Sequence, residues 1–253
     1  MLSLEPPATR FDLRFTVARV PVRVHPLFWL VAALLGFTAG DPVFVLIWVG
    51  VVFVSILVHE FGHAFAMRHY GESPRVVLHA MGGLTIAEPT PWGRTWANVA
   101  PGGRQQILIS AAGPGAGFLL AGLVLIVAMA ALLAWGAGAS FGVAEVPSGT
   151  LESPGLRYLD VLITSLLWVN IGWGLINLLP VYPLDGGNIS RQVFLMADPL
   201  EGVRKSLWVS VGVGAAAAAL GLLILNSVYI ALLFGFLAFS SYGMLRGQGI
   251  GRL

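Results

Sequence analysis

The residues best able to do chemistry together are His59, Glu60 and His63, which form the sequence HEFGH. On an α-helix, residues four apart lie one turn apart on the same face, so both imidazoles can reach one metal ion. Glu60 follows His59 directly, and its carboxylate can reach a water molecule in the open position of that ion. A carboxylate so placed acts first as general base and then as proton donor in zinc-dependent hydrolysis. The pattern therefore indicates a metal-activated water, although short motifs of this kind also occur by chance.

The setting of HEFGH favours metal binding over chance, because the motif lies near the end of a long apolar segment, residues 43–67. Ionisable side chains inside a membrane cost several kcal/mol unless they are paired or bound, so they usually serve a function. The helical rise from Val43 to His59 is about 24 Å, which leaves His59 about 6 Å short of crossing a core of about 30 Å. We therefore expect the metal within the bilayer, where a peptide bond under attack would belong to a membrane segment.

A catalytic zinc site usually has three protein ligands, so a third residue is needed. The chain has no cysteine, and the best candidate is Asp185 in NLLPVYPLDGG, residues 177–187, after the fourth apolar segment. Pro180 and Pro183 end the helix, and Gly186-Gly187 let the backbone turn back, so the carboxylate could point inward. The same Pro, Asp and Gly residues are also typical of an ordinary surface turn. Spacing alone therefore leaves open whether Asp185 is a ligand or part of a surface turn.

The composition of the chain indicates a membrane protein. Apolar residues make up 57% of the sequence and charged residues 10%, against about 45–50% and about 25% in soluble domains. Too few polar groups are present to cover a soluble surface, so the apolar excess must face lipid. We expect an all-α polytopic membrane protein with about six transmembrane helices and a small β element on the cytoplasmic side. The six apolar segments are residues 26–39, 43–67, 107–135, 158–180, 206–225 and 227–245.

The basic residues predict the orientation of these segments. With six spans and a cytoplasmic N-terminus, 13 of the 14 Lys and Arg residues lie inside, and Arg157 lies outside. This asymmetry follows the positive-inside rule, so we expect both termini in the cytoplasm. The expected organisation is an N-terminal cytoplasmic segment with an edge strand (1–25), a membrane protease domain (26–245, core 43–196) and a short cytoplasmic tail (246–253). The N-terminal sequence lacks the features of a signal peptide, so we expect none.

Two non-helical pieces predict a small sheet. Residues 14–24 partly alternate and are rich in β-branched residues, and residues 75–88 predict two short strands around Gly82-Gly83. Both pieces fall on the cytoplasmic side in the predicted topology, so they could form one sheet against the membrane. A substrate strand could add to an edge of that sheet, because protease substrates bind in extended form.

Two motifs together resemble a known family. HEFGH in one span and NLLPVYPLDGG at the end of a later one resemble the site-2 proteases, which are intramembrane zinc metalloproteases. VPVRVHP before the first span, Gly82-Gly83, and AAGPGAG at 111–117 resemble the family as well. The resemblance covers about residues 14–196. The family usually has Asn where this sequence has Gly117, so any polar role of that position is absent here.

The resemblance implies a role for each site residue. His59, His63 and Asp185 would hold one zinc ion, and Glu60 would activate the water. Asn177 would position the substrate or stabilise the developing oxyanion.

Asn170 and Asn177 lie seven residues apart, on one face of the fourth span. An amide there can donate to a substrate carbonyl or form a hydrogen bond between helices. We favour the catalytic role for Asn177 and the structural role for Asn170.

The expected activity is that of a zinc metalloendopeptidase acting in regulated intramembrane proteolysis. Its expected partners are a transmembrane protein substrate and the lipid bilayer, and an unidentified regulatory membrane protein could contribute. The expected location is a bacterial or archaeal cell membrane. The net charge of +2 and the scattered basic residues argue against binding of nucleic acid.

Three alternatives stay open at this point. The chain could be a membrane metal-binding or transport protein, or a non-catalytic membrane scaffold of the same family. It could also be an enzyme of the prenyl-protein protease kind, which has HExxH but normally takes its third ligand, a glutamate, from a second helix. Substitution of Glu60 and Asp185, followed by zinc analysis and cleavage assays, separates these functions.

Overall fold

The computed structural model describes residues 5–37, 41–88, 102–135 and 154–250 of the chain. The chain forms two compact units. The first unit comprises residues 1–97 and 115–174, and the second comprises residues 98–114 and 175–253. Each unit is described by itself below.

A four-stranded sheet in the first unit confirms the two strand-forming pieces expected from the sequence. Its strands are β1 (Leu13–Val17), β2 (Val20–Val24), β3 (Pro74–His79) and β4 (Gly82–Ala87), in the order β1-β2-β3-β4. The β1–β2 and β3–β4 pairs are antiparallel, whereas β2 and β3 are parallel. The predicted edge strand is thus half of a hairpin. Ala18 and Arg19 turn this hairpin with φ values of 47° and 64°, as a two-residue turn requires.

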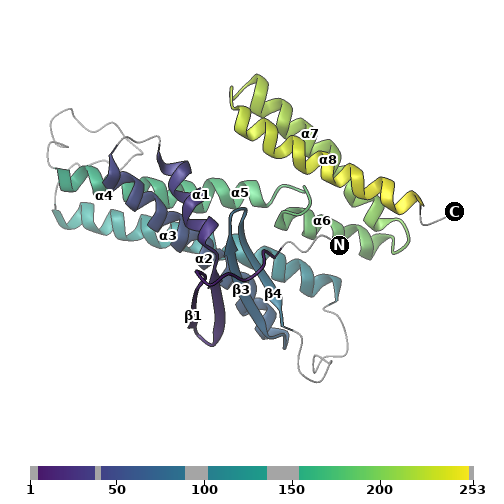
Figure 1. The fold of residues 1–253 in the computed structure, drawn as a ribbon, viewed down its shortest axis with the longest axis horizontal. Coiled ribbons are helices and arrows are strands. Elements are labelled where there is room, and N and C mark those ends of the chain that lie inside the picture. The colour runs from purple at the N-terminus through teal and green to yellow at the C-terminus, as the bar shows by residue number, and fades with distance from the viewer. Residues whose placement is uncertain (1–4, 38–40, 89–101, 136–153, 251–253) are drawn as a thin grey trace. The chain divides into compact units, whose positions relative to one another are not determined.

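Helices α1 (Pro26–Gly36) and α2 (Pro42–His69) connect β2 to β3. Because β2 and β3 pair with each other, the chain that leaves the sheet through α1 returns to it through α2 (Figure 1). Side chains cap both helices. His25 Nδ1 accepts from Leu27 N at 3.2 Å, and Asp41 Oδ1 accepts from Val43 N at 2.8 Å.

Among the described residues, five helical segments are long and apolar enough to cross a membrane, and they correspond to five of the six predicted spans. The remaining predicted span, residues 26–39, contains α1, which has 11 residues. Eleven residues rise about 16 Å, about half of a hydrocarbon core. The out-and-back path of α1 and α2 still returns the chain to the sheet. The five segments are Pro42–His69, Gly103–Ala131, Gly155–Asn177, Gly202–Leu223 and Val228–Gly247.

One face of the sheet packs against the half of α2 that carries HEFGH. The apolar core joins alternate residues of β2 and β3 to α1 and to Phe61 and Ala64 of α2. Arg68 at the end of α2 also donates to the carbonyl of Ala18 in the β1–β2 turn, at 2.5 Å. The motif helix is therefore fixed to the sheet. The buried members of this core are Val20, Val22, Val24, Phe28, Phe61, Ala64, Val76 and Leu78.

The fourth span contains α4 (Pro154–Leu167), a π-helical stretch η2 (Trp168–Trp173) and α5 (Gly174–Asn177). Asn170 lies in η2 with 4% of its surface exposed, and its Nδ2 donates to Ser55 Oγ of α2 at 2.8 Å. This interhelical bond is the structural role predicted for Asn170. Helix α3 (Gly103–Trp135) comes close to this pair, since a Cβ on Gly117 would lie 3.4 Å from Asn170 Oδ1.

The second unit contains α6 (Asp185–Ala197), α7 (Gly202–Leu223) and α8 (Val228–Ile250). Helices α7 and α8 form a hairpin with a short connection (Figure 1). Glycines allow the two helices to approach closely. A Cβ on Gly214 would lie 3.1 Å from Ala238 Cβ, and one on Gly221 would lie 2.6 Å from Ile230 Cγ2.

Candidate metal centre

The two histidines of HEFGH are arranged as ligands of a single ion. His59 Nε2 and His63 Nε2 lie 3.1 Å apart. Two nitrogens bound to one tetrahedral zinc ion, each at about 2.0–2.1 Å, would lie about 3.3–3.4 Å apart. The nitrogen and oxygen donors of His59, Glu60 and His63 all lie within 4.8 Å of one another. The pair therefore fits a divalent ion with little rearrangement.

The Glu60 side chain is buried against strand β4. It is 5% exposed, and Thr85 Oγ1 donates to Glu60 Oε2 at 2.6 Å. The same hydroxyl lies 3.1 Å from the main-chain oxygen of Glu60. Gly83 leaves the space that the carboxyl group occupies, because a Cβ on that residue would collide with Glu60 Cγ, Cδ and Oε1. Sequence analysis did not identify Thr85, and it noted Gly83 only as part of the turn between two predicted strands and of a family resemblance.

The turn that carries Asp185 is held by the α7–α8 hairpin. Val181 is fully buried in a cluster with Phe234 and Leu237 of α8. Tyr182 N donates to Ser210 Oγ of α7 at 3.1 Å. The hairpin therefore determines where residues 177–187 lie within the second unit.

Gly186 and Gly187 serve packing, which differs from the conformational role expected for them. Neither glycine has a positive φ. A Cβ on Gly186 would collide with the carbonyl of Leu178, and a Cβ on Gly187 would lie 2.5 Å from Tyr182 N. The first turn of α6 can therefore lie against the preceding backbone only because these two residues lack side chains.

Asn177 and Asp185 are in direct contact. Asn177 Nδ2 donates to Asp185 Oδ2 at 2.6 Å. The structure thus brings the predicted residues together in two groups, with His59, Glu60 and His63 in the first unit and this pair in the second. The roles of Asp185 as third ligand and of Asn177 in catalysis stay predictions.

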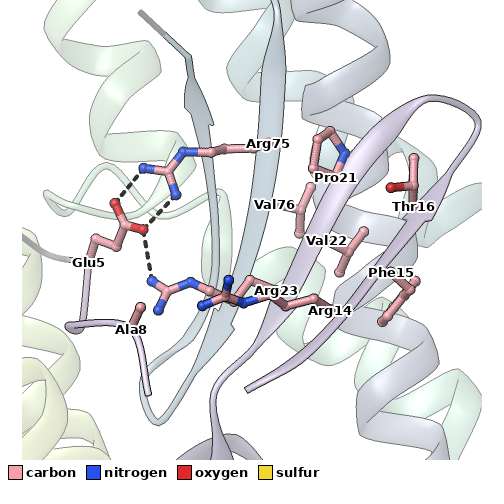
Figure 2. A pocket seen from close by; sticks show the side chains of 10 residues that line it. All are labelled: Glu5, Ala8, Arg14, Phe15, Thr16, Pro21, Val22, Arg23, Arg75 and Val76. Atoms are coloured by element: carbon pink, nitrogen blue, oxygen red, sulfur yellow. Dashed lines mark hydrogen bonds and ion pairs between the residues drawn. The ribbon is translucent and has the colours of Figure 1, made fainter. Parts of the chain in front are cut away.

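The other face of the sheet carries an ionic cluster that holds the N-terminal segment (Figure 2). Arg75 donates to both carboxylate oxygens of Glu5 at 2.5 and 2.6 Å, and Arg23 donates to Glu5 Oε1 at 2.7 Å. Hydrogen bonds from Arg75 lower the pKa of Glu5. Burial opposes ionisation of Asp12, but hydrogen bonds from Thr9 and Arg23 outweigh it and lower the pKa of Asp12 to about 2.

Comparison with known proteins assigns the chain to a family. The sequence profile of peptidase family M50 matches residues 47–219, about two thirds of the chain. The chain belongs to peptidase family M50. Both HEFGH and NLLPVYPLDGG fall within the matched residues.

The curated relatives are distant and longer than this chain. A zinc metalloprotease from Methanocaldococcus jannaschii is 23% identical over 229 residues, which cover 85% of this chain and 55% of that protein. A relative from Synechocystis is 26% identical over 228 residues, covering 82% of this chain and 51% of that protein. The chain thus spans about half the length of the curated relatives it matches.

A solved structure has the same fold. The site-2 protease from Methanocaldococcus jannaschii matches with a TM-score of 0.54 and 21% identity, over 93% of this chain and 95% of that one. The likeness confirms the predicted architecture of membrane helices with a small sheet. Together with the five apolar helices, the M50 family assignment identifies an integral membrane protein.

Proposed function

We propose that this chain is a zinc-dependent endopeptidase that cleaves membrane proteins within or next to their transmembrane segments. The observation that carries the proposal is the His59–Glu60–His63 group, in which Glu60 and His63 are buried and His59 is half-buried, on a helix long and apolar enough to span a membrane. Its two Nε2 atoms lie 3.1 Å apart, as ligands of one ion would. Membership of peptidase family M50 supports hydrolysis of peptide bonds over storage or transport of the metal.

Three side chains would hold the zinc ion, namely His59, His63 and Asp185. Two neutral imidazoles and a carboxylate are an ordinary donor set for a catalytic zinc. When bound, the ion would lower the pKa of a water molecule and polarise the peptide carbonyl. Asn177 supports the ligand role of Asp185, because its hydrogen bond orients one carboxylate oxygen and so limits the directions of the other.

Glu60 would move the proton in the reaction. Its carboxylate takes a proton from the attacking water and returns it to the leaving amine. Asn177 would stabilise the substrate oxyanion. An amide nitrogen carries two hydrogens, so this side chain can orient Asp185 with one and donate to a substrate carbonyl with the other.

The substrate would be a transmembrane protein that unwinds locally, because a helix hides its carbonyls in hydrogen bonds. Strand β4 offers an edge for an extended substrate, since β3 is its only neighbour in the sheet of the described residues. Proline substitutions along β4 should weaken cleavage and leave the zinc content intact. Unchanged cleavage would exclude this mode of binding. A separate regulatory membrane protein could present the substrate to the protease.

For the topology, we propose a cell membrane location with residues 1–25 and 246–253 in the cytoplasm and residues 26–245 as the membrane domain. The distribution of 13 of 14 basic residues supports this orientation. The pairing of β2 with β3 supports it too, because it returns the chain to its starting side. The chain has no native cysteine, so Ser3→Cys and Ser148→Cys variants can be labelled with an impermeant maleimide in intact cells. Labelling of Ser3→Cys would contradict the orientation.

The deciding experiment is Glu60→Gln in the full chain within its native membrane. We expect bound zinc to be retained and cleavage to fall by about 10²–10⁴. Membrane proteins trapped by this variant would include the substrate. If Glu60→Gln leaves the physiological readout intact while zinc stays bound, the chain is a metal-binding or transport protein instead.

A further inference from the structure

We infer that Thr85 is a positioning residue for Glu60, and that strand β4 fixes the side chain of this general base. The inference rests on the proposed function for the role of Glu60, and it adds a residue that HEFGH does not contain. The Thr85 hydroxyl lies 2.6 Å from Glu60 Oε2, a short hydrogen bond to a buried carboxylate. Thr85 touches Glu60 and not the reacting atoms, so it acts through the base.

The register of the sheet places Thr85 against Glu60. Alternate residues of a strand point to the same face, so Gly83 and Thr85 share a face of β4. These two residues pair with Leu78 and Val76 of β3, which belong to the core that packs on α2. A slip of one residue would turn both away from the helix. The β3–β4 pairing therefore determines which hydroxyl meets the carboxylate.

Gly83 and Thr85 limit the carboxyl group in different ways. Glutamate has several rotatable bonds, so HEFGH by itself leaves the position of its oxygens undetermined. The missing Cβ of Gly83 makes room for Cγ, Cδ and Oε1, and the Thr85 hydroxyl fixes Oε2. Proton transfer requires the base to lie within hydrogen-bond reach of the water, and small misplacements are costly. Gly83 and Thr85 of β4 thus restrict the carboxylate to one position before the transfer.

A purely structural role for Thr85 makes a different prediction. Its hydroxyl also lies 3.1 Å from the main-chain oxygen of Glu60, so it could simply tie β4 to α2. In that case the loss of the hydroxyl would have the same effect whether or not the Glu60 side chain is present. It would also affect the protein as a whole, and not the rate of the chemical step in particular.

The first test measures kinetics on the purified full chain with a transmembrane substrate. Thr85→Val removes the hydroxyl and keeps the shape, whereas Thr85→Ser keeps the hydroxyl. We expect Thr85→Val to lower kcat about 10- to 100-fold, with KM and zinc content unchanged. We expect Thr85→Ser to retain most of the wild-type kcat. Thr16→Val, on the exposed face of β1, is the matched control and should behave as wild type. Full kcat in Thr85→Val, or an equal loss in Thr85→Ser, would overturn the inference.

The second test uses the metal-free protein and needs no activity. Thr85→Val is combined with Glu60→Ala in a double-mutant cycle, read by thermal unfolding. We expect Thr85→Val to lower Tm by about 2–4 °C in the wild-type background and to have little effect beside Glu60→Ala. Equal shifts in both backgrounds would overturn the inference. If the wild-type chain cleaves nothing, the proposed function fails, while this cycle still decides whether Thr85 holds the Glu60 side chain.

Discussion

The two groups of predicted site residues are positioned by different kinds of structure. His59 and His63 are brought together by one turn of α2, and the sheet packs against that same stretch of helix. Asp185 instead follows an irregular turn whose position depends on the α7–α8 hairpin. The spacing of the histidines would survive in any intact helix, whereas the position of the carboxylate requires contacts with residues far away in the sequence.

Because of this difference, mutations in the two regions should have different effects. A mutation that disrupts the contact between β4 and α2 should move the Glu60 carboxylate and leave the histidine pair in place. A mutation that disrupts the packing of residues 177–187 should move Asp185 and so weaken zinc binding. Measuring zinc content together with cleavage therefore distinguishes the two regions.

The largest expected effect is that of Asp185→Ala. Loss of one of three protein ligands should lower zinc affinity by at least about 100-fold and abolish cleavage. Zinc titration of the purified variant gives the affinity. Asp198→Ala is the control, because Asp198 lies in the same unit and pairs with Lys205 at 2.7 Å instead. Equal zinc affinity in both variants would remove Asp185 from the ligand set.

Gly186→Ala should imitate the loss of Asp185 without changing any ligand. The added methyl would collide with the backbone at Leu178, and overpacking of this kind costs about 1–3 kcal/mol. We expect both zinc content and cleavage to fall. Gly212→Ala on α7 is the matched control, because a Cβ there meets no atom within 4 Å. A Gly186→Ala variant with full zinc content and activity would show that the turn tolerates displacement.

Gly83→Ala should produce the opposite pattern in the first unit. Its methyl group would displace the Glu60 side chain, so we expect cleavage to fall about 10- to 100-fold while zinc stays bound. Gly50→Ala on α2 has open space for its methyl and serves as the control. Loss of zinc in Gly83→Ala would break the contrast between the two regions.

Ser210→Ala tests the influence of the hairpin on the turn. It removes the acceptor of Tyr182 N, and an unsatisfied buried N–H costs about 1–3 kcal/mol. We expect a zinc affinity about three- to tenfold weaker, since part of that cost falls on the position of the turn. Ser241→Ala on α8 is the control. Ser241 is fully buried, and its Oγ has no hydrogen-bond partner among the described residues, so its loss should cost nothing.

The smallest effect concerns pH and the N-terminal segment. The pKa of Asp12 falls from 3.8 to about 2 on folding, so its contribution to stability is complete above pH 3.8 and is lost as the pH falls towards 2. We expect the amide of Thr9, which donates to Asp12 Oδ2, to lose its protection from hydrogen exchange over that range. Asp12→Asn should show faster exchange already at neutral pH. Protection that persists at pH 2 would contradict the assignment.

Much of the fold was accessible from sequence because its signals are local or compositional. Five of the six predicted apolar segments are long helices, since a membrane span must be a continuous apolar run. The strand pieces were predicted from alternation and their turn residues. The length of α1 could not be predicted in this way, because an apolar run does not reveal where its helix ends. The return path through α2 depends on the pairing of β2 with β3.

The sequence by itself determined the class of the protein and the placement of His59, Glu60 and His63 on one helix, because helical spacing depends only on neighbouring residues. Only the tertiary structure decided which groups support them. Thr85 meets Glu60 through the register of β4 on β3, and Asp185 meets Asn177 through a turn packed on two distant helices. Thr85 lies 25 residues from Glu60, and the turn between Asn177 and Asp185 is held by α7 and α8, so no local pattern encodes these supports.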